Sequence, residues 1–192
     1  MQRALHYSHT LLAALIARFP DGHYIDGTLG KGNDTHFILS QPDFSGQVTA
    51  FDIQAAALQF SEQKLASLPN RSQATLLQAS HHLIDALVEA KPLHGAIYNL
   101  GYLPGGDHQI TTAPATTLQS IQQVAQRLVV GGQIILVIYS GHPEGQIEKN
   151  ALFEELSQWP QEQFQVLHYG FINQRNHPPQ LLIIERIAHA KN

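Results

Sequence analysis

The sequence has 192 residues, a formal net charge of −4, 12 histidines and no cysteine. This length suits one domain with a full core, and 43% hydrophobic with 14% charged residues is typical of a globular protein. The lack of cysteine excludes disulfides, thiolate metal sites and a cysteine nucleophile, and the negative charge argues against a generally basic nucleic-acid binder. A polyanionic partner must therefore meet a local patch.

The first twenty residues contain an apolar run that is too short to span a bilayer. Histidines and Arg18 interrupt this run, and no small-residue cleavage site follows it, which argues against a signal peptide. We therefore expect a single domain over residues 1–192, with no membrane partner and a cytoplasmic location.

Apolar spacing, caps and stop signals predict the elements in chain order. They are a helix over 8–19, a strand over 23–27, a helix over 33–41, a strand over 46–53, a helix over 54–68, a strand over 73–80, a helix over 83–90, a strand over 93–100, a helix over 111–132, a strand over 133–140, a helix over 144–159, and strands over 164–172 and 180–187. Asn33 or Asp34 is expected to cap the second helix, and the helix over 111–132 has threonine capping, Pro114 in its first turn and a glycine stop.

Strands and helices alternate, and the middle strands are continuous apolar runs. This pattern predicts an α/β fold with a mostly parallel sheet that is covered by helices on both faces. The last two strands have no helix between them, so we expect an antiparallel hairpin at one edge of the sheet.

The segment 24–37, YIDGTLGKGNDTHF, places an acid and close-set glycines at the tip of the first strand. Its glycines, Gly27, Gly30 and Gly32, do not fit the G-x-G-x-x-G spacing of a dinucleotide site. Asp26 would repel a pyrophosphate and attract an ammonium group. S-adenosylmethionine carries an amino-acid end and no phosphate, so it suits this turn better than NAD.

Asp52 is a second acid, and it ends the next predicted strand. A carboxylate at this position can accept hydrogen bonds from both ribose hydroxyls of a nucleoside. The alternative is that Asp26 and Asp52 cap neighbouring helices while the glycines only form a tight turn.

The pattern Asp26-x-Thr28-x-Gly30-x-Gly32 resembles the first motif of class I methyltransferases. The stretches 99–107 (NLGYLPGGD), 139–145 (YSGHPEG) and 173–186 (NQRNHPPQLLIIER) resemble one branch of them, long labelled putative rRNA methylases. That branch includes the tRNA 5-(aminomethyl)uridine methyltransferases of the wobble position. The resemblance implies a Rossmann-like fold with seven strands. It also implies methyl transfer from S-adenosylmethionine to the exocyclic amine of an aminomethyl-uridine, which gives the methylaminomethyl form. The implied partner is the tRNA anticodon region, and a homodimer is also allowed.

The cofactor in such a fold would lie along the first three strand ends, with adenine near the residue after the third strand. The residues expected to bind it are Asp26, Thr28, Gly30, Gly32, Asn33, Asp34, Thr35, Asp52, Gln54, Ser80, His81 and Asn99. A metal site at His81 and His82 is not expected, because adjacent residues on an extended segment point in opposite directions.

Asn99 resembles the first residue of the Asn-Pro-Pro-Tyr motif of amino-methyltransferases, although Leu100 and Gly101 replace the prolines. In that motif the asparagine oxygen and the next backbone carbonyl accept hydrogen bonds from the amine. The alternative is that Asn99 only tethers the glycine-rich loop behind it.

The substrate amine must also lose a proton before it can attack the methyl group. Asp107 could attract the aminium group or shuttle its proton, and His142, which follows Tyr139 closely, could act as a base. The alternatives are that Asp107 only helps to form the turn and that His142 is a surface or hydrogen-bonded residue. Contacts with the substrate are expected from Tyr102, Gly105, Asn173, Arg175, Asn176 and His177.

Three functions therefore remain open. The first is methylation of the wobble aminomethyl-uridine, and the second is methylation of a small amine or of rRNA on the same scaffold. The third is a donor-binding fold that has lost catalysis and serves as an assembly partner.

Overall fold

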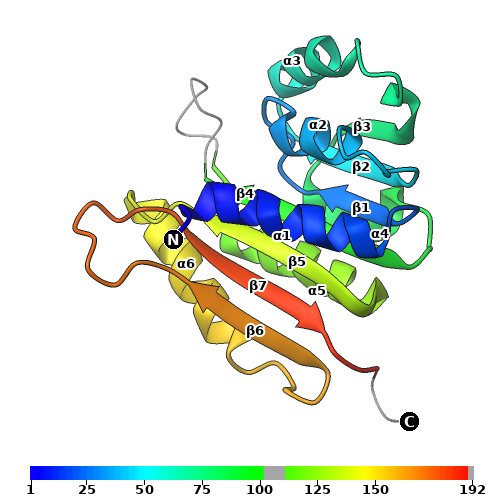
Figure 1. Ribbon diagram of the computed structural model, residues 1–192. Helices are drawn as coiled ribbons and strands as arrows, with labels where there is room; N and C mark the ends of the chain where they lie inside the picture. Colours follow the sequence, from blue (N-terminus) through cyan, green and yellow to red (C-terminus); the bar gives the residue numbers. More distant parts are fainter. Residues whose placement is uncertain (102–110, 190–192) are drawn as a thin grey trace.

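The computed structural model describes residues 1–101 and 111–189, and it forms one seven-stranded sheet with helices packed around it (Figure 1). Its elements are α1 (Ala4–Arg18), β1 (His23–Asp26), α2 (Asn33–Leu39), β2 (Gln47–Asp52), α3 (Ala55–Leu65), the 3-10 turn η1 (Arg71–Gln73), β3 (Ala74–Gln78), the 3-10 turn η2 (His81–Leu83), α4 (Ile84–Leu87), β4 (Leu93–Leu100), α5 (Pro114–Arg127), β5 (Leu128–Ile138), α6 (Pro143–Leu156), β6 (Phe164–Tyr169) and β7 (Gln180–Arg186). Within the described ranges no helix is long and apolar enough to cross a membrane.

The strand order is β3-β2-β1-β4-β5-β7-β6. The first five of these strands run parallel, whereas β7 pairs antiparallel with both β5 and β6. The chain fills one side of β1 with β2 and β3 and then returns to its other side with β4, so the order reverses between β1 and β4. In open α/β sheets a ligand cleft forms at the carboxyl ends of the strands at such a reversal.

Helices cover both faces of the sheet, as the alternation of elements predicted. On one face, α1, α2 and α3 bury side chains such as Leu12, Ile38 and Leu65 against Tyr24 of β1 and Ile97 of β4. A second cluster on the other face joins α4, α5 and α6 to alternate residues of β4 and β5. The α/β fold with a mostly parallel sheet and an antiparallel C-terminal pair is confirmed.

The structure corrects the expected ends of several helices. The helix predicted over 111–132 begins at Pro114 and ends at Arg127, with Ala113 rather than a threonine at its N-cap. Leu128 is buried beside Leu93 as the start of β5, so burial in the sheet outweighs continuation of the helix. The helix predicted over 83–90 is reduced to the four residues of α4. Gly32 occupies the N-cap of α2, in place of the Asn33 or Asp34 that was expected.

Gly27, the residue after β1, lies against the ring of Tyr98. Its N–H donates to the carbonyl of Ile97 at 2.9 Å, which fixes its backbone to β4. A β-carbon at Gly27 would lie 2.0 Å from Cε1 of Tyr98. The Tyr98 side chain is fully buried, and its hydroxyl is 2.7 Å from Oγ of Ser120, so the ring has little room to move.

We therefore expect Gly27→Ala to lower the free energy of unfolding by about 1–3 kcal/mol through overpacking against Tyr98. Gly141→Ala is the matched control, because a β-carbon there meets nothing within 4 Å. Urea unfolding followed by circular dichroism measures both variants. Equal losses at the two positions would show that the Tyr98 contact is not the cause.

Candidate active site

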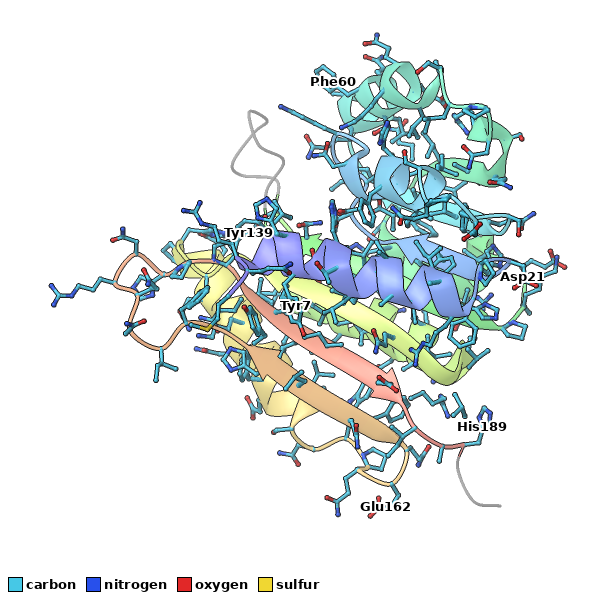
Figure 2. The ribbon with its side chains drawn as sticks, in the orientation of Figure 1. Tyr7, Asp21, Phe60, Tyr139, Glu162 and His189 are labelled. Carbon is cyan, nitrogen blue, oxygen red and sulfur yellow. The ribbon has the colours of Figure 1, made fainter. Side chains whose placement is uncertain are left out.

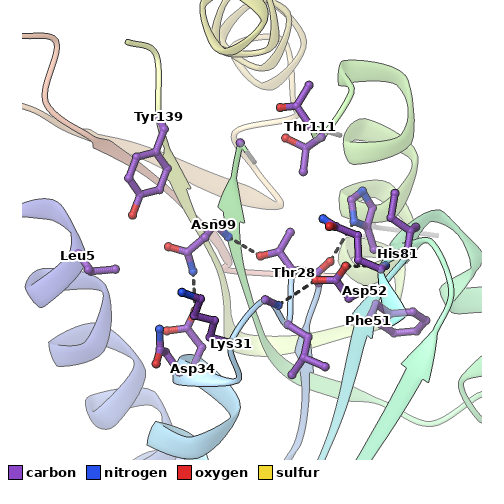
Figure 3. A pocket seen from close by; sticks show the side chains of 18 of the residues that line it. Leu5, Thr28, Lys31, Asp34, Phe51, Asp52, His81, Asn99, Thr111 and Tyr139 are labelled. Carbon is purple, nitrogen blue, oxygen red and sulfur yellow. Dashed lines mark hydrogen bonds between the residues drawn. The ribbon is translucent and has the colours of Figure 1, made fainter. Parts of the chain in front are cut away.

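A cavity of about 1410 Å³ opens at the carboxyl ends of β1, β2 and β4, where the strand order reverses (Figure 3). Most of the residues predicted from the sequence that the structure describes line it. These are Thr28, Gly30, Asn33, Asp34, Asp52, Gln54, Ser80, His81, Asn99, Tyr139, His142 and His177. The chain thus brings into one hollow residues that are up to 149 positions apart, because parallel strands end at the same edge of a sheet.

Asp26 is not among the lining residues, and its side chain is fully buried. Its Oδ2 accepts a hydrogen bond from the hydroxyl of Thr35 at 2.7 Å, and its Oδ1 accepts one from the N–H of Thr28 at 3.2 Å. The predicted direct contact with a ligand ammonium group is therefore corrected. Asp26 lies beneath the glycine turn and ties the end of β1 to the first turn of α2, and Thr35 is likewise buried.

The burial of Asp26 has an electrostatic consequence. Burial and, after it, the neighbouring Asp34 carboxylate raise the pKa of the Asp26 carboxyl to about 7, against the lowering effect of the hydrogen bonds from Thr35 and Thr28. A negative charge on either acid therefore makes ionisation of the other less favourable.

The glycine turn between β1 and α2 uses left-handed backbone at Gly30 and Gly32, with φ of 52° and 69°. Asp52, at the end of β2, accepts the N–H of Gly30 through Oδ2 and the N–H of Gln54 through Oδ1, both at 2.9 Å. One carboxylate therefore joins the turn to the next strand end. Asp52 also lines the cavity, where its contact with a ribose stays a prediction.

Asn99, near the end of β4, is held at both its backbone and its side chain. Its backbone N–H donates to Oγ1 of Thr28 at 2.7 Å, and its side-chain Nδ2 donates to Oδ2 of Asp34 at 2.5 Å. Because the amide nitrogen turns toward Asp34, the amide oxygen points the other way, toward Tyr139 (Figure 3). Burial, followed by the charge of Asp34, raises the pKa of the Tyr139 phenol, so it stays protonated and can donate a hydrogen bond.

His81 begins the turn after β3, and its Nδ1 lies 2.9 Å from the carbonyl oxygen of Gly27. The carbonyl can only accept, so Nδ1 carries the hydrogen and Nε2 is left as an acceptor. That Nε2 is buried and has no hydrogen-bond partner among the residues that the structure describes. Burial lowers the pKa of His81 to about 4, which keeps the ring neutral. The neighbouring Ser80 hydroxyl lies 2.7 Å from Nδ1 of His82.

His142 serves as the N-cap of α6, because its Nδ1 accepts the N–H of Gly145 at 3.1 Å. The exposed carboxylate of Glu144 lies 3.3 Å from the same nitrogen. The lone pair that a general base would use is thus turned toward the helix. This geometry favours the structural alternative for His142 over the predicted role as a base.

Only some of the residues expected to contact the substrate line the cavity. Asn173, Arg175 and Asn176 are exposed on the loop between β6 and β7 and do not line the cavity, whereas His177 of the same loop does. Tyr102, Gly105 and Asp107 lie outside the described residues.

The cavity also contains residues that the sequence analysis did not select. His9 of α1 lines it and lies 2.6 Å from Asp34, 25 positions away, and Thr111 and Thr112 line it from the segment before α5. A histidine on a helix carries no local signal of such a distant partner, so the pattern of residues alone could not have identified His9.

The fold and this cavity are those of a class I methyltransferase. Residues 48–185 match the family model described as "Putative rRNA methylase", and the chain belongs to this family. A crystal structure of a putative rRNA-methylase from Clostridium thermocellum has a TM-score of 0.90 and 37% identity, and the match covers 97% of this chain and 99% of that one. A putative methyltransferase from Streptococcus mutans in complex with SAH has a TM-score of 0.85 and 34% identity, with the same coverage.

Curated relatives match over shorter spans. A chloroplastic tRNA (mnm(5)s(2)U34)-methyltransferase from Arabidopsis thaliana is 33% identical over 133 residues, which is 65% of this chain and 48% of the relative. A ribosomal RNA small subunit methyltransferase H from Lactiplantibacillus plantarum is 33% identical over 96 residues, 48% of this chain and 30% of the relative. The chain therefore spans half or less of the length of these curated relatives.

We expect the stability of the protein to depend on pH through Asp26. The pKa of its carboxyl is about 7 in the fold and about 4 in an unfolded chain, so between these values the folded state holds a proton that the unfolded state has released. The carboxyl therefore costs the wild type stability as the pH rises through this window. An asparagine side chain cannot titrate. The free energy of unfolding of Asp26→Asn, measured relative to that of the wild type, should therefore increase from pH 5 to pH 8.

Urea unfolding at both pH values measures the difference. Asp43→Asn, on an exposed residue, is the control for the loss of one negative charge. A difference between wild type and Asp26→Asn that stays constant from pH 5 to pH 8 would contradict the raised pKa.

Proposed function

We propose that this chain is an S-adenosylmethionine-dependent RNA methyltransferase, and that it methylates the exocyclic amine of 5-aminomethyl-(2-thio)uridine at the tRNA wobble position. The product would be 5-methylaminomethyl-(2-thio)uridine. The observation that carries the proposal is the Asn99 amide, whose nitrogen is held by Asp34 so that its oxygen faces the cavity. Support also comes from the family, from the similar SAH-bound methyltransferase structure and from the chloroplast relative that is named as a tRNA methyltransferase.

The polar groups of the cavity suit the parts of S-adenosylmethionine. The buried Nε2 of His81, which meets no donor within residues 1–101 and 111–189, would accept a hydrogen bond from the exocyclic amine of adenine. Asp52 would meet the ribose hydroxyls, and the glycine turn would pass along the amino-acid end. The cofactor supplies a methyl group that its sulfonium already activates, so the protein mainly has to align the acceptor and exclude water.

Asn99 would perform the alignment on the substrate side. Its amide oxygen accepts an N–H of the substrate amine and thereby points the lone pair of that amine at the methyl carbon. An amide oxygen does not itself take a proton, so the amine has to reach it already deprotonated, and Asn99 then only orients the amine. Tyr139 lines the cavity on the side toward which this oxygen points (Figure 3).

The RNA would approach over the loop between β6 and β7. This loop lies at the same end of the sheet as Tyr139, beyond the carboxyl end of β5 (Figure 2). It carries the exposed Asn173, Arg175 and Asn176, whose side chains can bond to phosphate and base edges, while His177 reaches the cavity wall. An overall acidic protein would thus meet RNA through a local group of polar and basic side chains.

A second candidate is methylation of ribosomal RNA, which the match to ribosomal RNA small subunit methyltransferase H favours. The same cavity could also take a small free amine. Resemblances to O-methyltransferases are at 12% to 13% identity and bear on the fold alone.

The test is methyl transfer by the purified chain to tRNA that carries 5-aminomethyl-uridine at the wobble position, with ribosomal RNA and the free nucleoside as parallel substrates. Mass spectrometry of the digested nucleosides should show the aminomethyl form consumed and the methylaminomethyl form produced in tRNA only. Asn99→Ala is the matched variant, and we expect it to lower turnover about 100-fold while S-adenosylhomocysteine still binds. Product in ribosomal RNA alone, or in the free nucleoside alone, would replace the tRNA assignment with the corresponding alternative.

A further inference from the structure

His9 links helix α1 to Asp34 at the wall of the cavity. Its Nε2 lies 2.6 Å from Oδ1 of Asp34, and its ring stacks on Phe37 with centroids 4.1 Å apart and planes at 20°. The stacking and the hydrogen bond together fix the ring in one orientation. The His9 side chain is 29% exposed and lines the cavity, whereas that of Asp34 is 7% exposed.

Asp34 shares its two oxygens between two partners. Oδ1 meets His9, and Oδ2 accepts Nδ2 of Asn99 at 2.5 Å. The negative charge of Asp34 is repelled by Asp26 below it, because each carboxylate lies within the field of the other. A hydrogen-bond donor on Oδ1 stabilises the charged carboxylate against this repulsion and limits its rotation, so that Oδ2 stays directed at Asn99.

The orientation of the Asn99 amide decides whether it can serve as an acceptor. The two ends of an amide have almost the same shape, but one donates and the other accepts. Rotation by half a turn would present an NH₂ group to the substrate amine, which offers N–H groups of its own. Asp34 selects the productive rotamer because a carboxylate can only accept.

We propose that His9 is a positioning residue for methyl transfer, which acts through Asp34 to keep the oxygen of Asn99 turned toward the substrate amine. The role rests on the proposed function of Asn99. What His9 contributes is an N–H at its Nε2 position, so its capacity to take up a proton is not needed.

This role makes a specific demand on substitutes. Glutamine carries an amide nitrogen at about the reach of Nε2 and can donate to Asp34, whereas asparagine is shorter and alanine carries no donor. Neither glutamine nor asparagine can act as a proton acceptor at neutral pH. The glutamine variant therefore tests whether a hydrogen-bond donor is enough without proton transfer. The asparagine variant tests whether the donor must also reach as far as Nε2 does.

The experiment compares His9→Ala, His9→Asn and His9→Gln for kcat and KM on tRNA with the wobble aminomethyl-uridine, and for S-adenosylhomocysteine affinity by calorimetry. We expect the alanine and asparagine variants to lose about 10- to 100-fold in kcat, with KM and affinity near those of the wild type. His9→Gln should recover most of the lost kcat. His6→Ala and His6→Gln, on an exposed position of the same helix that does not line the cavity, should behave as the wild type.

A second measurement does not depend on the substrate. The side-chain amide signals of Asn99 in ¹⁵N–¹H spectra, assigned by their loss in Asn99→Ala, should shift or broaden in His9→Ala and stay near the wild-type positions in His9→Gln. Unfolding curves identify any variant that fails to fold. Because this readout needs no turnover, it decides the role of His9 even if the wild type transfers no methyl group to the tRNA, which would refute the proposed substrate alone.

Two results would overturn the proposal. A glutamine variant as slow as the alanine variant would show that His9 exchanges protons rather than positions Asp34. Unchanged Asn99 amide signals and unchanged kcat in His9→Ala would show that Asp34 holds the amide without help.

Discussion

The whole site depends on one buried carboxylate. Asp26 ends β1 without access to the cavity, and it accepts hydrogen bonds from the N–H of Thr28 and the hydroxyl of Thr35. Burying a carboxylate is costly unless its oxygens are bonded, so these two partners are held firmly in place. Because Thr35 belongs to the first turn of α2, the same bond fixes the direction in which α2 leaves the glycine turn, and with it the position of Asp34.

Asp34 in turn orients Asn99, the residue proposed to hold the substrate amine. Thr28 accepts a hydrogen bond from the backbone N–H of Asn99, and Asp34 accepts one from its side-chain amide. The residues at both ends of the turn after β1 therefore bind the end of β4. These two strands are neighbours only because the strand order reverses between them. The fold therefore supplies the place where a donor and an acceptor can meet, and the hydrogen bonds of two acids set the orientation of the groups there.

Much of this could be predicted from the sequence, because it follows from local patterns. The strand at 93–100 has the predicted bounds, and the alternation of elements predicts the covered sheet. The helix at 111–132 was predicted too long, since the glycines at 131–132 lie inside β5, where the register with β4 shifts, and not after a helix. A strand-end acid is visible in the sequence, but whether it faces the ligand or lies beneath the turn depends on tertiary packing. The His9–Asp34 contact, between two helices, has no local signature at all.

The central claim is that Asp26 shapes the cofactor site without touching the cofactor. Calorimetry of S-adenosylhomocysteine binding to the wild type and to Asp26→Ala tests it most directly, with a crystal structure of the wild-type complex to locate the ligand. The account predicts that the variant remains folded and loses affinity by about 100-fold, because two unpaired donors release the turn. The ligand should lie along the glycine turn with Asp26 still buried beneath it. Unchanged affinity in the variant, or a ligand bound away from this turn, would contradict the account.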